Sequence, residues 1–150
     1  MLDLTCPRPA PHLAPQTCAA GTFALGQAAF CTGCKAGFYA PAGSAACSPC
    51  KPGTFSKTLR SASCALCPAG QQCPNVATSS PTACPIGYYA PKEGTKLCSP
   101  CPVNTYQDGT GATQCKPCDA GKNTRNQVGQ SLCQAVRNPS NPASNRRMLF

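Results

Sequence analysis

Cysteine is the residue type whose spacing in this chain points most directly to chemistry. Fifteen cysteines occur in 150 residues, and ten of them form pairs of the type C-x2-C. The pairs are Cys31/Cys34, Cys47/Cys50, Cys64/Cys67, Cys98/Cys101 and Cys115/Cys118. Pairs of this type occur in disulfide frameworks, zinc knuckles and redox centres, so the surrounding residues must decide among the three.

The pairs belong to a short unit that is repeated along the chain. A unit starts at the second cysteine of a pair, reads C-x2-G-x-aromatic, continues through a variable stretch and closes with G-x3-C. A new unit begins every 16 or 17 residues, and units 1 to 7 open at Cys18, Cys34, Cys50, Cys67, Cys84, Cys101 and Cys118. A period this regular indicates duplication of one small element.

The third residue after each opening cysteine, here called the turn residue, is glycine in six units and asparagine in one. The turn residues are Gly21, Gly37, Gly53, Gly70, Gly87, Asn104 and Gly121. Glycine reaches positive φ without cost and asparagine is among its best substitutes, so we predict a left-handed turn here. Replacing Gly37 or Gly87 by valine is expected to damage its unit, whereas asparagine is expected to be tolerated.

The fifth residue after the opening cysteine is aromatic in five of the seven units. These residues are Phe23, Tyr39, Phe55, Tyr89 and Tyr106. We expect each ring to cover the disulfide of its own or the next unit and to supply most of the apolar burial there. The alternative is an exposed row of aromatic side chains that contacts a ligand.

The spacing suggests that each unit closes its own disulfide. Six of the proposed bonds enclose 12 to 14 residues and a seventh encloses five. The proposed bonds are Cys18–Cys31, Cys34–Cys47, Cys50–Cys64, Cys67–Cys73, Cys84–Cys98, Cys101–Cys115 and Cys118–Cys133. Spacing does not prove connectivity, so an interlaced pattern or a Cys73–Cys84 bond stays open. Cys6 is left over, which suggests a partner upstream, a partner chain or a free thiol.

Apolar side chains are too scarce to build an ordinary core. Leu, Ile, Val and Phe together contribute 19 of 150 residues, whereas chains below about 20% are expected to be disordered. Disulfides commonly replace the missing core in small extracellular units. We therefore predict a small disulfide-rich fold, an elongated tandem array of short irregular β-hairpin units with little regular secondary structure.

The composition also divides the chain into segments. A Pro-rich stretch at 1–17 precedes a first half of the repeats at 18–73, and a Ser/Thr/Pro connector at 74–83 separates it from a second half at 84–133. Residues 134–150 lack cysteine and periodicity, so we expect a disordered tail there.

The string C-x2-G-x-Y/F…G-x3-C-x2-C over residues 18–133 resembles the ephrin-receptor-like cysteine-rich repeat. That repeat belongs with the growth-factor-receptor and tumour-necrosis-factor-receptor cysteine-rich folds. The resemblance implies extracellular, rod-like modules that are usually part of longer chains. Asn104 and Asn123 depart from the pattern, at the turn and at the aromatic position. No kinase or other signalling domain accompanies the repeats, so a signalling receptor is not implied.

Metal and catalytic readings find less support in the sequence. Cys31, Cys34, Cys47 and Cys50 taken alone fit a four-cysteine zinc site, but five pairs do not divide into such sites without remainder. A redox C-x2-C needs a strand-to-helix setting that is missing here. The single histidine, His12, has no partners for nucleophilic catalysis. We expect no metal, no cofactor and no enzymatic activity.

Charge and hydropathy limit the classes of partner and the location that we expect for the chain. The net charge is +9, but the basic residues are scattered and not interleaved with aromatics, so nucleic acid is not expected. A more specific interpretation of the positive net charge is a weak attraction to anionic glycans. No stretch of this chain is long and apolar enough to span a membrane, and a span elsewhere in a full-length protein stays open. Because no signal peptide is recognisable, we expect a fragment of a larger surface protein or an incomplete gene model.

These observations predict a non-catalytic extracellular module that acts as a structural spacer or adhesive stalk of a surface or matrix protein. Its partner is expected to be an unspecified protein or glycan at the cell surface or in the matrix. A ligand-binding receptor ectodomain fragment is the main alternative, and an intracellular zinc-binding protein is a third.

Overall fold

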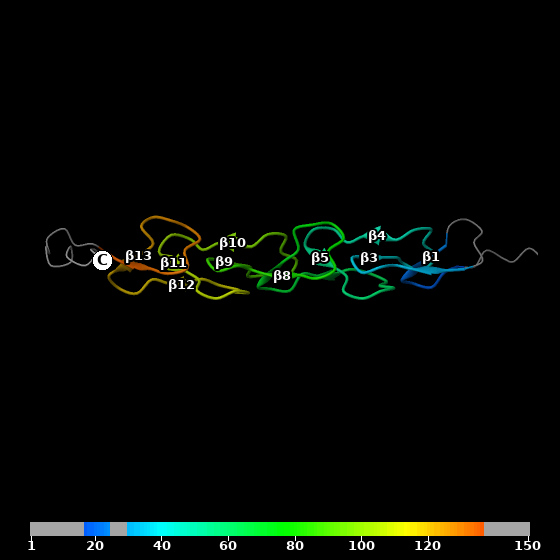
Figure 1. The fold of residues 1–150 in the computed structure, drawn as a ribbon, viewed down its shortest axis with the longest axis horizontal. Helices are drawn as coiled ribbons and strands as arrows, with labels where there is room; N and C mark the ends of the chain where they lie inside the picture. Colours follow the sequence, from blue (N-terminus) through cyan, green and yellow to red (C-terminus); the bar gives the residue numbers. More distant parts are fainter. Residues whose placement is uncertain (1–16, 25–29, 137–150) are drawn as a thin grey trace, which may run out of the picture.

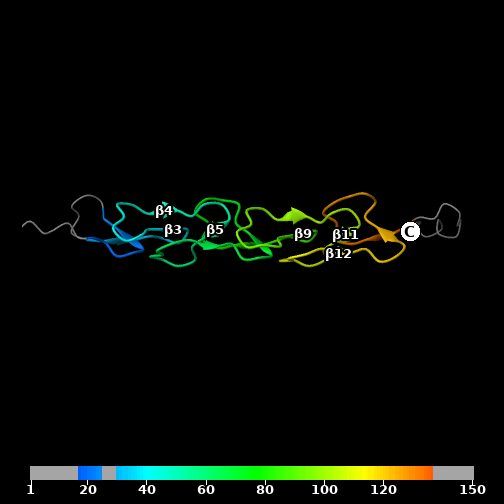
Figure 2. The same ribbon diagram turned by 180° about the vertical axis from the view of Figure 1, so that it is seen from behind.

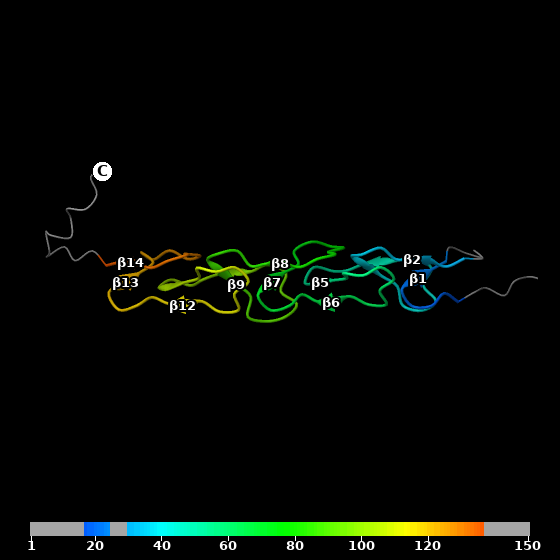
Figure 3. The ribbon, with the colours of Figure 1, turned by 60° about the horizontal axis from the view of Figure 1, so that its bottom comes forward.

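The computed structural model describes residues 17–24 and 30–136, and within these ranges the chain forms fourteen two-residue strands and no helix. The hairpins formed by these strands follow one another in chain order along a single long axis (Figure 1). Views from behind and after rotation about that axis show the same narrow array (Figures 2 and 3). The predicted fold class, an elongated tandem array of small disulfide-rich hairpins, is confirmed.

Each unit contains one antiparallel hairpin, and in the described ranges no strand pairs with a strand of another unit, although Tyr39 of unit 2 forms an isolated bridge to Ser61 of unit 3. The hairpins are β1 (Thr22–Phe23) with β2 (Thr32–Gly33), β3 (Phe38–Tyr39) with β4 (Ser48–Pro49), β5 (Thr54–Phe55) with β6 (Ala65–Leu66), β7 (Gln71–Gln72) with β8 (Thr82–Ala83), β9 (Tyr88–Tyr89) with β10 (Ser99–Pro100), β11 (Thr105–Tyr106) with β12 (Lys116–Pro117), and β13 (Lys122–Asn123) with β14 (Gln134–Ala135).

The repeated sequence explains where these strands lie. The first strand of a unit holds the fourth and fifth residues after the opening cysteine, and the second holds two residues that in five units are those between the cysteines of a pair. A tight turn precedes the first strand. In unit 2 the amide of Phe38 donates to the carbonyl of Lys35 at 3.1 Å, and the same bond occurs in all seven units. The C-x2-C pair is therefore a short strand with a cysteine at each end.

Backbone hydrogen bonds join each unit to the next. The amide of a turn glycine donates to the carbonyl of the sixth residue after the opening cysteine of the following unit, as from Gly37 to Ser56 at 2.8 Å. In the opposite direction, the amide of a loop residue donates to the opening-cysteine carbonyl of the preceding unit, as from Arg60 to Cys34 at 2.8 Å. The first bond recurs at five junctions and the second at six. These bonds satisfy backbone groups that a two-residue hairpin leaves unpaired.

The donor of the second bond, here called the return residue, lies four residues before the closing cysteine. The return residues of units 2 to 7 are Gly43, Arg60, Ala77, Gly94, Gly111 and Gly129. In unit 4 the equivalent of the closing cysteine is Pro81, and Ala77 stands four residues before it. Gly26, the comparable residue of unit 1, lies outside the described residues.

Units 1 to 5 also contact the unit after next. The return carbonyl of unit n+2 lies against the turn glycine of unit n, as Ala77 does against Gly37. The same contact joins Gly21 to Arg60, Gly53 to Gly94, Gly70 to Gly111 and Gly87 to Gly129. The contacts of a unit therefore extend beyond its immediate neighbour. We call the bonds to unit n+1 and the contact to unit n+2 together the interlock.

The buried interior consists of sulfur, backbone and small side chains. The opening cysteines of units 1 to 6 are 0–3% exposed, and Ala40 and Ala90, each the sixth residue after an opening cysteine, are fully buried. Ser56, Gln107 and Thr124 occupy the same position in other units and are also buried. The structure therefore closes its core with the sixth residue, whose role the sequence pattern does not indicate.

Residues 74–83, expected to be a connector between two halves, are continuous with the array. Ala77 within this stretch donates to the Cys50 carbonyl at 2.8 Å, and the amide of Ser56 donates to the Thr78 carbonyl at 3.1 Å. Residues 134–136, assigned to the tail, complete unit 7 through β14 and a bond from the Val136 amide to the Gly121 carbonyl. The rest of the expected tail lies outside the described residues.

Candidate functional site

The cysteine framework is the first candidate site that the sequence singles out. The structure joins fourteen cysteines in seven disulfides, with the paired Cα atoms 5.6–6.1 Å apart, within the usual range. The bonded pairs are the seven that the spacing suggests, including the short Cys67–Cys73 loop. Cys6 lies outside the described residues.

Unit 4 shows why one of these loops is short. Pro81 occupies the place of a closing cysteine, and Cys73 occupies the sixth position, where units 2 and 5 have a buried alanine. The side chain of Cys73 is fully buried and bonds Cys67 from inside the core. The second half of the unit 4 loop is therefore held by hydrogen bonds and not by a disulfide.

All seven turn residues have positive φ, from 62° at Asn104 to 89° at Gly53. The five glycines of units 1 to 5 are buried, whereas Asn104 and Gly121 are exposed. A Cβ built on any of the five would lie 2.5 Å or closer to the return carbonyl oxygen of unit n+2. Glycine is required at these five positions for two reasons, the backbone conformation and the approach of another backbone.

This finding corrects the expectation that asparagine is tolerated at Gly37 and Gly87. Any side chain there would meet the carbonyl of Ala77 or of Gly129. Asn104 belongs to unit 6, and no return residue of an eighth unit lies over it in the described part of the chain. Gly121 of unit 7 likewise has nothing within 4 Å of a built Cβ. Asparagine at position 104 thus meets the conformational requirement without the steric one.

The return residues are a second set of left-handed positions. Their φ values run from 56° at Ala77 to 76° at Gly43, and two of the six, Arg60 and Ala77, are not glycine. The left-handed region costs a residue with a Cβ about 1–2 kcal/mol relative to the right-handed one. The glycine found four residues before most closing cysteines is the sequence signal for this conformation.

The aromatic residues at the fifth position are half-buried in all five units that have them. They form no exposed row, since the exposed large apolar side chains in the described ranges include only Phe30 and Tyr88 among the aromatics. They do not dominate the interior either, because the fully buried side chains are cysteine and alanine. The rings therefore flank the core, and the size of their contribution to its apolar burial stays a prediction.

Two ion pairs lie near the C-terminal end of the described residues. Lys116 Nζ is 2.6 Å from Asp108 Oδ1, and Lys122 Nζ is 2.9 Å from Asp119 Oδ2. The hydrogen bond from Lys116 lowers the pKa of Asp108 and in turn raises the pKa of Lys116. The hydrogen bond to Asp119 raises the pKa of Lys122. All four side chains are largely exposed, so these pairs contribute little to stability.

A metal site and a membrane-spanning helix are two further candidate features. Within residues 17–24 and 30–136, no group of three or more His, Cys, Asp or Glu side chains is placed to hold a metal ion. The same part of the chain contains no helix with the length and hydropathy needed to cross a bilayer.

Comparison with known families matches the repeat geometry described above. The family model described as tyrosine-protein kinase ephrin type A/B receptor-like matches three times, at residues 37–84, 75–118 and 87–133. The matches together extend over residues 37–133, or 97 of the 150 residues. Comparison with curated proteins gave no match.

Proposed function

Because the chain belongs to the ephrin-receptor-like cysteine-rich repeat family, we propose that it is a non-catalytic module of a larger surface or matrix protein and serves as a rigid spacer or adhesive stalk. Repeats of this family are extracellular-domain modules. Seven disulfides agree with an oxidising location, where such bonds persist.

The interlock is the observation that carries the spacer role. A unit that contacted only its neighbour could hinge at the two-residue link between successive disulfides. Here the return carbonyl of unit n+2 lies against the turn glycine of unit n, so a bend at either intervening junction would separate buried backbone groups. The interlock therefore supports a rod whose length is set by the number of units.

Small-angle X-ray scattering of the oxidised protein tests this proposal. A compact domain of this length would have a radius of gyration of about 15 Å, and the rod is expected to exceed this value clearly. A scattering profile without a rod cross-section, or a radius near the compact value, would contradict the spacer. Intact mass before and after alkylation tests the disulfides, since about fourteen cysteines are expected to be protected until reductant is added.

A ligand-binding ectodomain fragment is the second candidate. It would need a built surface, and the described residues offer one at the junction of units 1 to 3. Two adjoining hollows occur there, one lined by aromatic side chains and one by basic side chains.

A further inference from the structure

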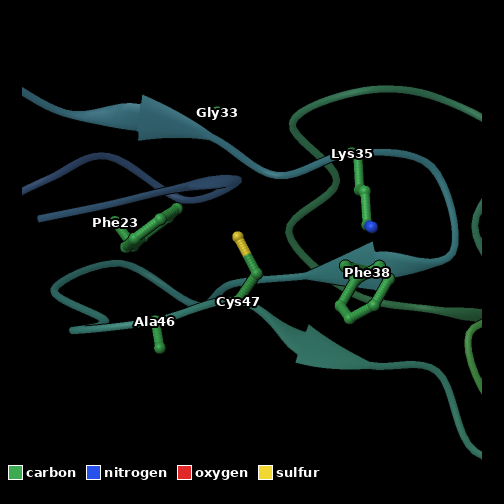
Figure 4. A pocket seen from close by; sticks show the side chains of 6 residues that line it. All are labelled: Phe23, Gly33, Lys35, Phe38, Ala46 and Cys47. Carbon is green, nitrogen blue, oxygen red and sulfur yellow. The ribbon is translucent and has the colours of Figure 1, made fainter.

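The two hollows share Gly33 and Lys35 and together form one surface, here called the junction site. The larger hollow has a volume of about 440 Å³ and includes the rings of Phe23 and Phe38 in its lining (Figure 4). The smaller, of about 260 Å³, is lined by Leu59 and Arg60 in addition to the shared residues. Units 1, 2 and 3 all contribute to it.

We propose that the junction site binds an acidic polysaccharide, with a sugar ring against the phenylalanine rings and a carboxylate or sulfate group between Lys35 and Arg60. The proposal goes beyond the spacer role and depends on it only for the extracellular setting. Three observations at Arg60, Gly33 and Lys35 support it.

Arg60 is held in a conformation that its position normally reserves for glycine. It has a φ of 57°, while four of the six return residues are glycine. A strained residue at an exposed loop is a reason to look for a function, since the surrounding structure must compensate for the strain. Leu59 beside it is 70% exposed, so burial of the neighbouring loop does not explain the choice.

Gly33 makes room for the Arg60 side chain. At later junctions the arrangement is reversed, because Leu66, Ala83 and Pro100 stand at the position of Gly33 and their side chains lie over a return glycine. Leu66 Cδ2, for example, lies 3.3 Å from a Cβ built on Gly94. At the first junction a Cβ built on Gly33 would instead lie 2.8 Å from Cγ of Arg60. The exchange of glycine and side chain fixes where the guanidinium stem runs.

Lys35 supplies a second cation next to the aromatic hollow. Its Nζ lies 4.9 Å from the centroid of the Phe38 ring, and Figure 4 shows it extending toward that ring. The ion pairs of the described residues involve Lys116 and Lys122 but neither Lys35 nor Arg60. The sequence has no acidic residue between Leu4 and Lys92, and in the described part of the chain no ion pair neutralises either cation.

The chemistry of the junction site matches an acidic sugar better than a simple anion. A guanidinium forms paired hydrogen bonds with planar carboxylates and sulfates. The C–H face of a pyranose ring carries small positive charges that suit the negative face of an aromatic ring. An isolated phosphate would use the cations and leave the phenylalanine hollow empty.

The test is a titration of the ¹⁵N-labelled oxidised protein with two tetrasaccharides, a heparin fragment for sulfate and tetragalacturonate for carboxylate. We expect that at least one of the two tetrasaccharides causes saturable changes in amide chemical shift. These changes should be confined to Phe23, Gly33, Lys35, Phe38 and Arg60. Shifts spread over all exposed lysines, or no shifts, would overturn the proposal. Equal binding of tetraglutamate would overturn it too, because the ligand would then be an acidic peptide.

Three variants separate the junction site from net charge. Arg60→Gly is expected to weaken binding by about tenfold or more while raising the unfolding midpoint, so unfolding cannot explain the loss. Gly33→Ala keeps every charge, has no left-handed φ to violate, and is expected to weaken binding several-fold by displacing Arg60. Lys92→Gln, in unit 5, removes the same charge as Arg60→Gly and is expected to change binding less than about twofold.

The outcomes also distinguish this proposal from the spacer role. A rod by scattering that shows no localised saccharide shifts refutes the junction site alone. A compact particle that binds saccharide at these amides refutes the spacer alone. Equal affinities for the Arg60→Gly and Lys92→Gln variants would show only a diffuse electrostatic attraction and would refute the site.

Discussion

Replacing Gly37 by alanine isolates the steric part of the interlock when it is compared with the same change at Gly121. Both residues are turn glycines, with φ of 83° and 79°. They differ in what a new methyl group would meet. At Gly37 it would meet the backbone carbonyl of Ala77, whereas at Gly121 nothing lies within 4 Å. Both variants therefore have the same conformational cost, and only Gly37→Ala adds a steric clash.

The expected magnitudes follow from these contacts. Holding alanine in the left-handed region costs about 1–2 kcal/mol, which is the whole expected effect at Gly121. At Gly37 the unit 4 loop must also move, which strains the packing by about 1–3 kcal/mol. That movement weakens the bonds from Gly37 to Ser56 and from Ala77 to Cys50, both 2.8 Å and each contributing about 1 kcal/mol. Gly37→Ala should thus cost about 2–4 kcal/mol more than Gly121→Ala.

Denaturant unfolding with the disulfides intact gives the two free energies, and hydrogen exchange locates the damage. The amide of Ala77 should lose protection in Gly37→Ala and keep it in Gly121→Ala, because only the first variant displaces its bond to Cys50. Oxidative refolding followed by peptide mapping should show mispaired cysteines for the first variant only. Equal costs for the two variants would mean that the carbonyl contact is not a structural requirement and that the interlock is wrongly described.

Three further changes test other parts of the fold. Ala77→Gly should stabilise the protein by about 1 kcal/mol, measured as a raised unfolding midpoint, because it relieves a φ of 56° without removing a side-chain contact of any size. Cys73→Ala combined with Pro81→Cys should move the unit 4 bond, so that peptide mapping finds Cys67 bonded to the new thiol; persistent free thiols would show that Pro81 is not equivalent to a closing cysteine. Lowering the pH should remove the small contribution of the Asp108–Lys116 pair to stability. Folding lowers the pKa of Asp108, so the pair stabilises the protein above the pKa of the unfolded state, and this contribution is lost as the pH falls through the pKa of the folded state. An NMR titration in which Lys116→Gln leaves the titration midpoint of Asp108 unchanged would contradict this.

The turn and the fold class could be predicted because they depend on single residue types. Glycine or asparagine at a fixed offset indicates positive φ, and the cysteine spacing, with too few apolar residues, indicates small cross-linked units. Both are local properties, and the repeat displays the turn residue in seven units and the regular cysteine spacing in six.

The interlock could not be predicted because it joins residues far apart in sequence. The contact of Gly37 with Ala77 spans 40 positions and involves backbone only, so no side-chain pattern reports it. The burial of the sixth residue after the opening cysteine could not be predicted either, because Ala40, Ser56 and Gln107 share burial but no chemical character. The exchange of Gly33 and Arg60 could not be predicted, because it depends on which residues of units 1 and 3 face each other in the fold.

The short bond in unit 4 has a mechanical consequence. Under tension, the force passes along the shortest covalent path, so a disulfide that closes a loop carries the force and the residues of that loop bear none. Between Cys18 and Cys133 the longest segment bypassed by no disulfide runs from Cys73 to Cys84. When its hydrogen bonds give way, these eleven peptide steps can lengthen to about 36 Å, at roughly 3.3 Å each. The rest of the covalent path between Cys18 and Cys133 is nearly inextensible, so unit 4 is the one part of this range that can lengthen substantially under tension.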